Sequence, residues 1–393
     1  MRGRPKSLYI IAGEASGDIL GARLLEGLKS LEPELRFRGV GGGEMAAQGM
    51  PSLFAMDELS VMGLAEVLPR LPGLLRRIRE TADDVIQTRP DALITVDSPD
   101  FCLRVARRVR AQLPDLKTIH YVAPTVWAWR PERAAKMAEV IDHVLALFPF
   151  EPPYMEAEGM SCDFVGHPVA AAPIPNPEAI AKARAAIGLS SDQPYLLVLP
   201  GSRRGEVTRL QTIFADAIAG FADRFQIVIP AAPAVYDQLK TDLSHWPRAT
   251  TLVPPDLVSR HKGALFAGAT AALAASGTVS LELAAARTPM VIAYNFNWLT
   301  TRLVRKKVIL DTVTLVNILT GTHAVPEYLL ENCTAENIRA GLDALLSNPA
   351  KAAEQIEVQD RALKLLGRDK PDVGLLAAES VLNFLAKDGG TAV

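Results

Sequence analysis

Short runs of apolar residues alternate with amphipathic stretches through the first half of the chain. Apolar runs of this length predict buried strands, and apolar spacings of three and four residues predict helices between them. The expected strands are Leu8–Ala12, Arg36–Val40, Ala92–Val96, Lys117–Val122 and His143–Leu147. The expected helices are Ile19–Ser30, Leu74–Thr88, Phe101–Gln112 and Pro131–Val140. This alternation predicts a parallel sheet that is covered by helices on both faces.

The same alternation restarts after a proline-rich interruption. Four prolines fall within Gly166–Pro177, which predicts a linker. The strands expected beyond it are Tyr195–Leu199, Gln226–Ile229, Ala271–Ala275 and Met290–Tyr294, and Ala335–Lys387 has a helical pattern throughout. We therefore predict an α/β fold with two doubly wound, Rossmann-like domains that face a cleft, with ligands at the C-terminal ends of the strands.

Length and composition agree with two domains and exclude several classes of function. A chain of 393 residues is long for a single core. Its 42 basic and 44 acidic residues nearly cancel, so nucleic acid is not an expected partner. Three widely spaced cysteines argue against a disulfide framework and a zinc knuckle, and they fit a reducing cytoplasm. The apolar runs are too short for a signal sequence or a membrane-spanning helix, so we expect a protein that is soluble or bound to a membrane face.

A turn rich in glycine and arginine follows the strand expected at Tyr195–Leu199. It reads P-G-S-R-R-G-E-V over Pro200–Val207. A strand, a turn and a helix start bring backbone N–H groups and the helix dipole to one place, where an anion can bind. Arg203 and Arg204 could add bidentate donors to phosphate oxygens. The alternative is an ordinary turn whose arginines are only solvated.

A second turn of this kind follows the strand expected at Ala271–Ala275. Ser276, Gly277 and Thr278 offer backbone and hydroxyl donors to a phosphate. Glu282 comes one helical turn later, where its carboxylate could chelate two ribose hydroxyls, or where it could simply belong to a capping box. Two such turns in one domain support each other.

The turn after the first strand carries two glycines and two carboxylates. It reads G-E-A-S-G-D over Gly13–Asp18, and Ser16 or Asp18 could cap the helix expected at Ile19. The turn lacks the G-x-G-x-x-G spacing and carries acids where a pyrophosphate would want none, which argues against a dinucleotide. Glu14 could hold sugar hydroxyls, act as a base, or be a charged turn residue.

Two further loops follow strands of the first half. Asp97 comes at the tip of the strand Ala92–Val96, where it could be a general base, whereas Asp100 fits the first turn of a helix. The loop Tyr121–Arg130 holds two tryptophans and an arginine, which could form an aromatic wall for a sugar or an acyl chain, or could pack in the core. His120 is expected to be a buried histidine with a satisfied side chain.

A basic amphipathic segment lies between Val61 and Arg79. Apolar residues recur there at helical spacing, with four arginines and one acid among them. Such a segment suits an anionic membrane surface or, alternatively, is an ordinary core-facing helix. Pro69 and Pro72 are expected to break the start of its helix.

Taken together, these residues resemble the lipid-A-disaccharide synthase family, whose members have the two-domain glycosyltransferase-B-type fold. The resemblance covers nearly the whole chain. Its most specific motifs are Gly13–Asp18, Val61–Gly63, Asp97–Phe101, His120–Arg130 and Pro200–Val207. It implies a hexosyltransferase that condenses UDP-2,3-diacylglucosamine with 2,3-diacylglucosamine 1-phosphate. The products would be the β-1,6-linked disaccharide 1-phosphate and UDP, with inversion at the anomeric carbon and with no metal ion or other cofactor.

The resemblance also implies roles for single residues. Asp97 matches the family's proposed general base, and Arg203 matches an arginine expected to neutralise the departing diphosphate. With Glu14 these are the catalytic candidates. The candidates for substrate and nucleotide binding are Gly13, Ser16, Gly17, Asp18, Gly201, Ser202, Arg204, Glu206, Ser276, Gly277, Thr278, Glu282 and Asn317. Asn317 matches a nucleotide-site asparagine that a partner subunit supplies in some members, and Arg204 stands where the family pattern has a small residue.

Location and organisation follow from the same resemblance. A hydrophobic patch in the family matches Val67, Leu68, Leu71, Leu74 and Leu75, which implies peripheral contact with the anionic inner membrane from the cytoplasm. The expected domains are 1–168 for the acceptor and lipid, 169–365 for the UDP-sugar, and a C-terminal helix in 366–393 that packs on the first domain. A homodimer is compatible with the pattern. The rivals are another transferase of this fold, a nucleotide-sugar 2-epimerase, and a non-catalytic nucleotide-binding module.

Overall fold

The structure is a computed structural model that describes residues 5–59, 64–127, 131–295 and 311–387, without the side chains of 64–70. Contacts divide the chain into two compact units. The first comprises Met1–Ala171 with Leu366–Val393, and the second comprises Ala172–Leu365. The domain limits expected from the sequence remain a prediction, because compact units need not fold independently.

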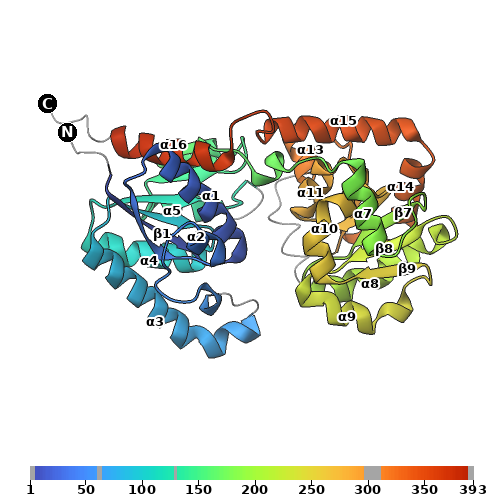
Figure 1. The fold of residues 1–393 in the computed structure, drawn as a ribbon, viewed down its shortest axis with the longest axis horizontal. Helices are drawn as coiled ribbons and strands as arrows, with labels where there is room; N and C mark the ends of the chain where they lie inside the picture. Colours follow the sequence, from blue (N-terminus) through green and yellow to red (C-terminus); the bar gives the residue numbers. More distant parts are fainter. Residues whose placement is uncertain (1–4, 60–63, 128–130, 296–310, 388–393) are drawn as a thin grey trace. The chain divides into compact units, whose positions relative to one another are not determined.

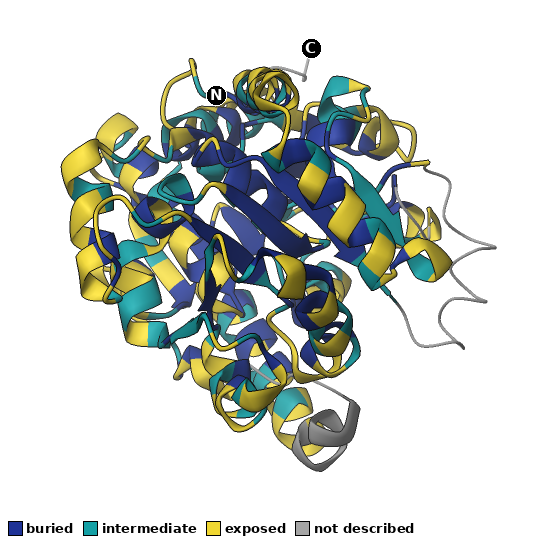
Figure 2. Ribbon diagram, turned by 90° about the vertical axis from the view of Figure 1, so that its right-hand side faces the viewer, coloured by how far each residue is buried: buried dark blue, intermediate teal, exposed yellow. Residues whose placement is uncertain are grey.

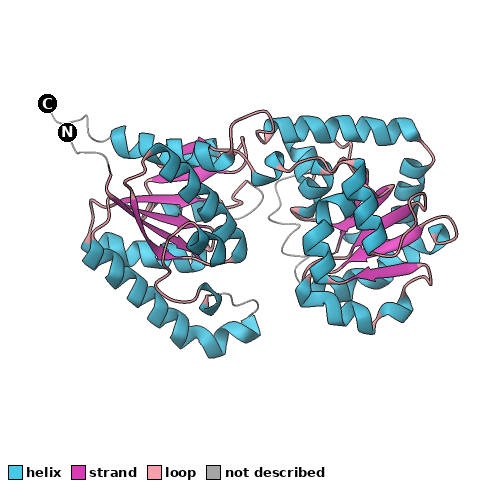
Figure 3. Cartoon of the chain, viewed as in Figure 1, coloured by secondary structure: helices cyan, strands magenta, loops and turns pink. Residues whose placement is uncertain are grey.

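The first unit is built on a parallel sheet of six strands in the order β2-β1-β3-β4-β5-β6. The strands are β1 (Ser7–Ala12), β2 (Arg36–Val40), β3 (Ala92–Val96), β4 (Lys117–Tyr121), β5 (His143–Ala146) and β6 (Ser161–Phe164). The helices are α1 (Ala15–Leu31), α2 (Gly43–Ala47), α3 (Leu64–Thr88), α4 (Pro99–Gln112), α5 (Glu132–Ala138), α6 (Pro152–Glu156) and α16 (Val373–Lys387). Helices flank the sheet on both sides, with α1 packed on α16 and α3 on α4 (Figure 1, Figure 3).

The second unit repeats this plan with strand order β12-β11-β10-β7-β8-β9, again parallel throughout. Its strands are β7 (Tyr195–Leu199), β8 (Gln226–Pro230), β9 (Thr250–Val253), β10 (Ala271–Ala275), β11 (Met290–Tyr294) and β12 (Glu327–Leu329). Its helices are α7 (Pro177–Ala186), α8 (Arg204–Ile218), α9 (Tyr236–Thr241), α10 (Pro255–Ala267), α11 (Val279–Ala285), α13 (Leu315–Thr320), α14 (Ala335–Leu346) and α15 (Pro349–Leu365).

The central strands form the buried core of each unit, because both of their faces are covered by helices. Every residue of β3 and β10 is buried, as are the four leading residues of β7. Figure 2 shows dark-blue strands among helices that carry exposed residues. The continuous apolar runs that predicted these strands are the signature of strands without a solvent-facing side. The α/β fold expected from the sequence is confirmed.

Three strands escaped prediction, and all three lie at the edges of the sheets. They are β6, β9 and β12. An edge strand is paired on one side only, and β9 and β12 are mostly half-buried. Their residues therefore need not be apolar, so they do not form the runs that marked the central strands.

Two expected helix starts were wrong. Helix α1 begins at Ala15 rather than Ile19, with Glu14 at its N-cap, so Ser16 and Asp18 lie inside its first turns and do not cap it. Helix α3 begins at Leu64 and continues through Pro69 and Pro72. A proline keeps a helical φ and costs the helix one backbone hydrogen bond, which this long helix tolerates.

The last helix packs against the first one through glycines. A Cβ added at Gly27 on α1 would lie 2.4 Å from the carbonyl oxygen of Gly374 on α16, so the two backbones are in close contact. Ser380 on α16 lies 2.8 Å from Nε2 of His143 on β5, and its hydroxyl donates to Asp163 at 2.6 Å. These contacts tie the end of the chain to the first sheet. In the described parts of the chain, no helix is both long and apolar enough to cross a membrane.

Candidate functional site

The second unit contains a cavity of about 670 Å³ that brings both predicted anion turns together. One turn follows β7 and the other follows β10, which are neighbours in the sheet although they are distant in sequence. From β7 the chain winds outward through β8 and β9, then returns to place β10 on the other side. This reversal is the topological switch point, where doubly wound sheets bind their ligands. The predicted residues that line the cavity are Gly201, Ser202, Arg203, Glu206, Ser276, Gly277, Thr278 and Glu282.

The first of these turns is closed by its own carboxylate. Gly201 has a φ of +120°, and Oε2 of Glu206 accepts the N–H groups of Ser202 and Arg203 at 3.1 and 3.2 Å. The hydroxyl of Tyr294 donates to Oε1 at 3.2 Å. Burial of Tyr294 and the adjacent Glu206 carboxylate raise the pKa of this phenol, which keeps it a donor. Two of the backbone N–H groups expected to meet a phosphate, those of Ser202 and Arg203, are therefore already occupied.

Arg203 remains as the cation of this turn. Its side chain is 73% exposed, lines the cavity and lies 3.4 Å from Oε1 of Glu206. A carboxylate at this distance can orient the guanidinium without removing it from solvent. Arg203 therefore offers a side-chain charge to an anion at this turn.

The second turn leads into α11 and carries an ion pair that sequence reasoning missed. Oε1 of Glu282 lies 2.6 Å from Nζ of Lys262, which comes from α10. Both side chains line the cavity and both are partly exposed. No sequence pattern predicted a role for Lys262, because it is the last of four consecutive polar residues, Ser259–Lys262, on α10. Only the fold brings it to Glu282.

Two predicted nucleotide-site residues do not line this cavity. Arg204 is exposed and directs its Nε to the carbonyl of Ala234 at 3.4 Å. Asn317 is fully buried. Its Nδ2 donates to the backbone carbonyl of Val325 at 2.9 Å and to Oε1 of Glu327 at 3.3 Å, and its Oδ1 accepts the N–H of Val325 at 3.0 Å. In this chain Asn317 holds the segment that leads into β12.

In the first unit, the turns after β1 and β3 also meet at a switch point. The strand order reverses between these two strands, and Ala12 pairs with Val96 at their ends. Asp97 and Ser98 follow with φ values of +53° and +43°, a region that non-glycine residues rarely adopt. Strain of this kind is typical of functional turns.

Two glycines pack closely against this strained turn. A Cβ at Gly13 would lie 2.7 Å from Oγ of Ser98, and a Cβ at Gly17 would lie 3.2 Å from the carbonyl of Val96. The N–H of Asp97 donates to the backbone carbonyl oxygen of Tyr121 at 2.9 Å, and Oδ1 of Asp97 accepts the N–H of Ser98 at 2.8 Å. The structure thus places the turn Gly13–Asp18 beside the turn that carries Asp97 and Ser98.

The acids of the first turn have different surroundings. Asp18 is buried, and its carboxylate accepts three backbone N–H groups from Gly42, Glu44 and Met45 at 2.7–3.1 Å. It therefore caps the start of α2, which leaves its oxygens occupied within the protein. Glu14 and Ser16 are exposed beside Gly13. A substrate would meet these two side chains before Asp18.

The aromatic loop packs into the core where it is described. Trp127 is buried, edge-on to Phe150 at 5.1 Å between centroids, and its indole N–H donates to Glu151 at 3.3 Å. Burial raises the pKa of Glu151 to about 7. The aromatic-wall interpretation is therefore wrong for Trp127, while Trp129 and Arg130 lie outside the described residues.

His120 behaves as expected from the sequence. It is buried, and its Nδ1 lies 2.7 Å from Oγ1 of Thr95. Burial lowers the pKa of His120 to about 4. Its interpretation as a buried histidine with a satisfied side chain is confirmed.

The predicted membrane segment lies in the first half of α3. Leu71 and Leu75 are 39% and 38% exposed, and Leu74 is half-buried. The side chains of Val67 and Leu68 lie outside the described residues. The guanidinium of Arg77 pairs with Glu58 and Glu80 and stacks 4.3 Å above the ring of Phe54, so this arginine is engaged within the protein.

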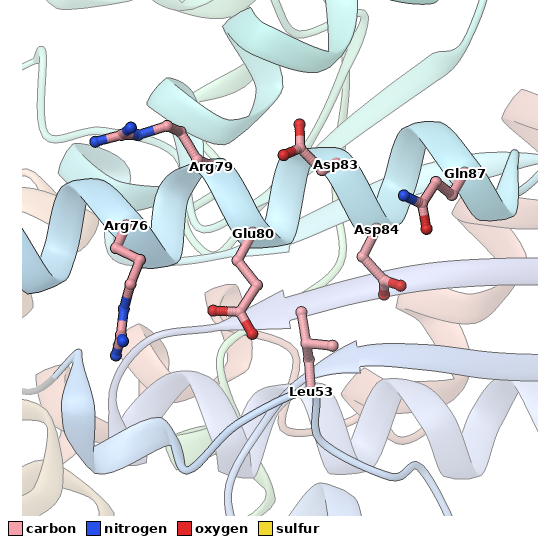
Figure 4. Close-up of a pocket in the computed structure, with 7 residues that line it drawn as sticks. All are labelled: Leu53, Arg76, Arg79, Glu80, Asp83, Asp84 and Gln87. Atoms are coloured by element: carbon pink, nitrogen blue, oxygen red, sulfur yellow. The ribbon is translucent and has the colours of Figure 1, made fainter.

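The second half of α3 borders a groove of about 750 Å³ (Figure 4). Arg76, Glu80 and Asp84 point from the helix toward Leu53 in the figure. Asp84 is bound to Arg38 and Tyr9, and Glu80 to Arg77. Two of the groove's acids are thus paired within the protein, and none of the described residues that line it is a predicted catalytic or nucleotide residue. Among the residues that the structure describes, no three His, Cys, Asp or Glu side chains are grouped to hold a metal ion.

Comparison with solved structures supports the fold. The UDP-GlcNAc 2-epimerase from Neisseria meningitidis, bound to UDP-GlcNAc, aligns with a TM-score of 0.63 over 97% of this chain and 100% of that one, at 13% identity. The UDP-GlcNAc 2-epimerase from Methanocaldococcus jannaschii, in complex with UDP-GlcNAc and UDP, gives a TM-score of 0.59 over 97% and 99% of the two chains, at 14% identity. At such low identity these matches establish the two-domain α/β architecture alone.

Comparison of sequences identifies the family. The family model for lipid-A-disaccharide synthetase matches residues 8–374. The lipid-A-disaccharide synthase of Ruegeria pomeroyi is 52% identical over 98% of this chain and 96% of its own length. That of Rhodospirillum centenum is 45% identical over the same shares of the two chains. The chain therefore belongs to the lipid-A-disaccharide synthase family of glycosyltransferases, enzymes that transfer a hexosyl group to form the lipid A disaccharide.

Proposed function

We propose that the chain transfers 2,3-diacylglucosamine from UDP to the 6-hydroxyl of 2,3-diacylglucosamine 1-phosphate. The observation that carries this proposal is the cavity of the second unit, where the two turns and helices α10 and α11 present Arg203, Lys262 and Glu282. A nucleotide diphosphate needs cations beside its phosphates and a hydrogen-bond acceptor beside its ribose hydroxyls. This cavity offers both.

Within that cavity we assign the diphosphate to Arg203 and the ribose to Glu282. The exposed guanidinium of Arg203 can neutralise the charge that develops on the departing UDP. The other predicted residues of the two turns, Gly201, Ser202, Ser276, Gly277 and Thr278, would shape the space around the phosphates. Glu206, which is occupied by its own turn, would act by orienting Arg203 rather than by touching the nucleotide.

The first unit supplies the base in this proposal. The Asp97 carboxylate takes the proton of the acceptor 6-hydroxyl while the oxygen attacks the anomeric carbon of the sugar. The new C–O bond forms as the bond to the diphosphate breaks, and UDP leaves with the electron pair. A single displacement inverts the anomeric carbon and yields the β-1,6 linkage. Glu14 and Ser16 are exposed beside Asp97's turn, so we assign them to holding acceptor hydroxyls.

Access to lipid-linked substrates would come from contact with an anionic membrane face. We assign this contact to the first half of α3, where Leu71 and Leu75 are exposed and Arg76 and Arg79 follow them. The homodimer stays a prediction. Asn317, which could have served a partner's site, is bound within its own unit.

The test is an assay with UDP-2,3-diacylglucosamine and 2,3-diacylglucosamine 1-phosphate that follows both UDP release and disaccharide. Asp97→Asn should lower kcat by roughly 100-fold or more, as expected for loss of a general base, and should leave UDP affinity unchanged. Asp115→Asn is the matched control and should leave turnover unchanged, because Asp115 is an exposed acid at the N-terminal end of β4, away from the strand ends that carry Asp97.

Two outcomes would contradict the proposal. Unchanged turnover in Asp97→Asn would remove Asp97 as the base. Epimerisation of UDP-GlcNAc without any disaccharide would favour the activity named for the solved structures of similar fold.

A further inference from the structure

A small pocket in the first unit lies between α4 and α5 and is lined by cations. Its volume is about 180 Å³. Arg104 and Arg107 reach it from α4, and Arg133 and Lys136 reach it from α5. Among the described residues that line it, Asp100 is the one acid.

Most of this positive charge is not neutralised by the protein. Arg107 pairs with Glu139 at 3.0 Å. In the part of the chain that the structure describes, the side chains of Arg104, Arg133 and Lys136 have no hydrogen-bond or ion-pair partner. Even with Asp100 in the lining, these three cations leave the pocket with a net positive charge, and like charges that line one pocket repel one another. An anionic ligand would therefore stabilise this arrangement.

The pocket also lies at the C-terminal ends of the strands, where a substrate is expected. Pro99 and Pro124, which line it, follow the C-terminal ends of β3 and β4. Doubly wound sheets bind their ligands at these C-terminal ends. Pro99 is two residues from Asp97 in the sequence, so the pocket begins close to the turn that carries the proposed base. Leu103 and Met137 add apolar surface to the same wall.

We propose that this pocket binds a phosphate monoester, and that in the reaction it holds the phosphate of the lipid-linked acceptor. The second part rests on the proposed function. Arginine matches phosphate oxygens with two parallel N–H donors, and lysine adds a compact charge. The acceptor's phosphate carries the charge that three unpaired cations require, and the apolar wall suits the sugar and the start of an acyl chain.

The test compares two acceptors in the wild-type chain and in the double variant Arg133→Gln/Lys136→Gln. One acceptor is 2,3-diacylglucosamine 1-phosphate and the other lacks the phosphate. The double variant should lose roughly ten- to a hundred-fold in kcat/KM for the phosphorylated acceptor, mainly through KM, as expected for lost charged hydrogen bonds. It should lose nothing with the other acceptor, and KM for the UDP-sugar should not change.

The matched control is Arg108→Gln, which removes an exposed arginine of α4 that does not line the pocket. It should behave as wild type with both acceptors. An equal loss of kcat/KM with both acceptors in the double variant would overturn the proposal. So would a parallel loss of binding to phosphatidylglycerol vesicles with acceptor discrimination intact, because the pocket would then serve a membrane headgroup.

Failure of the proposed function would be seen separately, as a wild-type chain that makes no disaccharide. The pocket is then tested by calorimetric binding of glucosamine 1-phosphate. Tighter binding by wild type than by the double variant would support the site. Equal binding, or none, would overturn it.

Discussion

At the scale of single residues, the strained turn after β3 is the feature on which the first unit's chemistry depends. Asp97 and Ser98 are held at positive φ, and any side chain at position 13 would force Ser98 to shift. The turn that carries Asp97 is thus packed against the loop after β1. A larger residue at position 13 should displace Ser98, and with it the adjacent Asp97, although it makes no direct contact with Asp97.

We therefore expect Gly13→Ala to lower both activity and stability. The new methyl group would overlap Oγ of Ser98, and overpacking of this kind costs about 1–3 kcal/mol. Denaturant unfolding measures the loss of stability, and the disaccharide assay measures kcat. Gly43→Ala is the control, because nothing lies within 4 Å of a Cβ at Gly43. Equal stability and activity in both variants would show that Ser98 moves freely.

Sequence alone could locate the turns but not the partners of their side chains. Asp18 and Glu206 were expected to meet substrate, yet both carboxylates satisfy backbone N–H groups. Asp18 reaches residues 24 to 27 positions away, and Asn317 bonds a residue eight positions away. Such pairings depend on how loops cross in space, and no local pattern specifies them. The glycines of the turns, such as Gly13 and Gly201, could be predicted from the sequence, because a tight turn directly after a strand favours glycine.

At the scale of elements, α3 divides into two halves of opposite character. Its first half exposes Leu71 and Leu75 beside arginines, whereas Glu80, Asp83 and Asp84 occupy its second half. An anionic surface would attract the first half and repel the second. The helix would then meet a membrane at its N-terminal end and not along its whole length.

We expect Leu71→Ser/Leu75→Ser to weaken binding to anionic vesicles several-fold, because two exposed apolar side chains are lost from the contact. Co-sedimentation with phosphatidylglycerol vesicles measures the effect, and wild-type binding should also fall as salt is raised. Leu31→Ser, at a leucine of similar exposure at the end of α1, should bind as wild type. Undiminished binding by the double variant would exclude α3 as the contact.

The sequence predicted nine of the twelve strands of the two sheets, counting those whose run overlaps the observed strand. The strands it missed are the edge strands β6, β9 and β12. One of them, β12, has only three residues, which is too short for any periodicity to show. Helix starts were the other weakness, since α3 continues through two prolines that a local rule treats as breaks.

At the scale of the whole molecule, the chain leaves the first unit at Ala171 and returns to it at Leu366. The return is secured by α16, whose backbone touches that of α1 at Gly27 and Gly374. Ser380 adds a polar link to β5 and β6 through His143 and Asp163. The first unit is therefore assembled from the two ends of the sequence.

Gly27→Ala should separate these two helices. Its Cβ would lie 2.4 Å from the Gly374 carbonyl, so α16 must shift, at a cost of about 1–3 kcal/mol. Hydrogen exchange should then be faster in Val373–Lys387 than in wild type, while exchange in β7 and β10 stays unchanged. Gly73→Ala, at a helical glycine with nothing within 4 Å, is the control. Unaltered exchange in α16 would show that the contact is not tight.

The split construction of the first unit has a consequence for the order in which the protein is made. The ribosome completes residues 172–365, and with them every strand of the second sheet, before it reaches α16. Until then the face of α1 that α16 covers has no partner. Nascent chains commonly fold their N-terminal domain first. Here the N-terminal unit is the one that must wait, and a nascent chain that stops short of α16 carries a finished second unit beside an unfinished first.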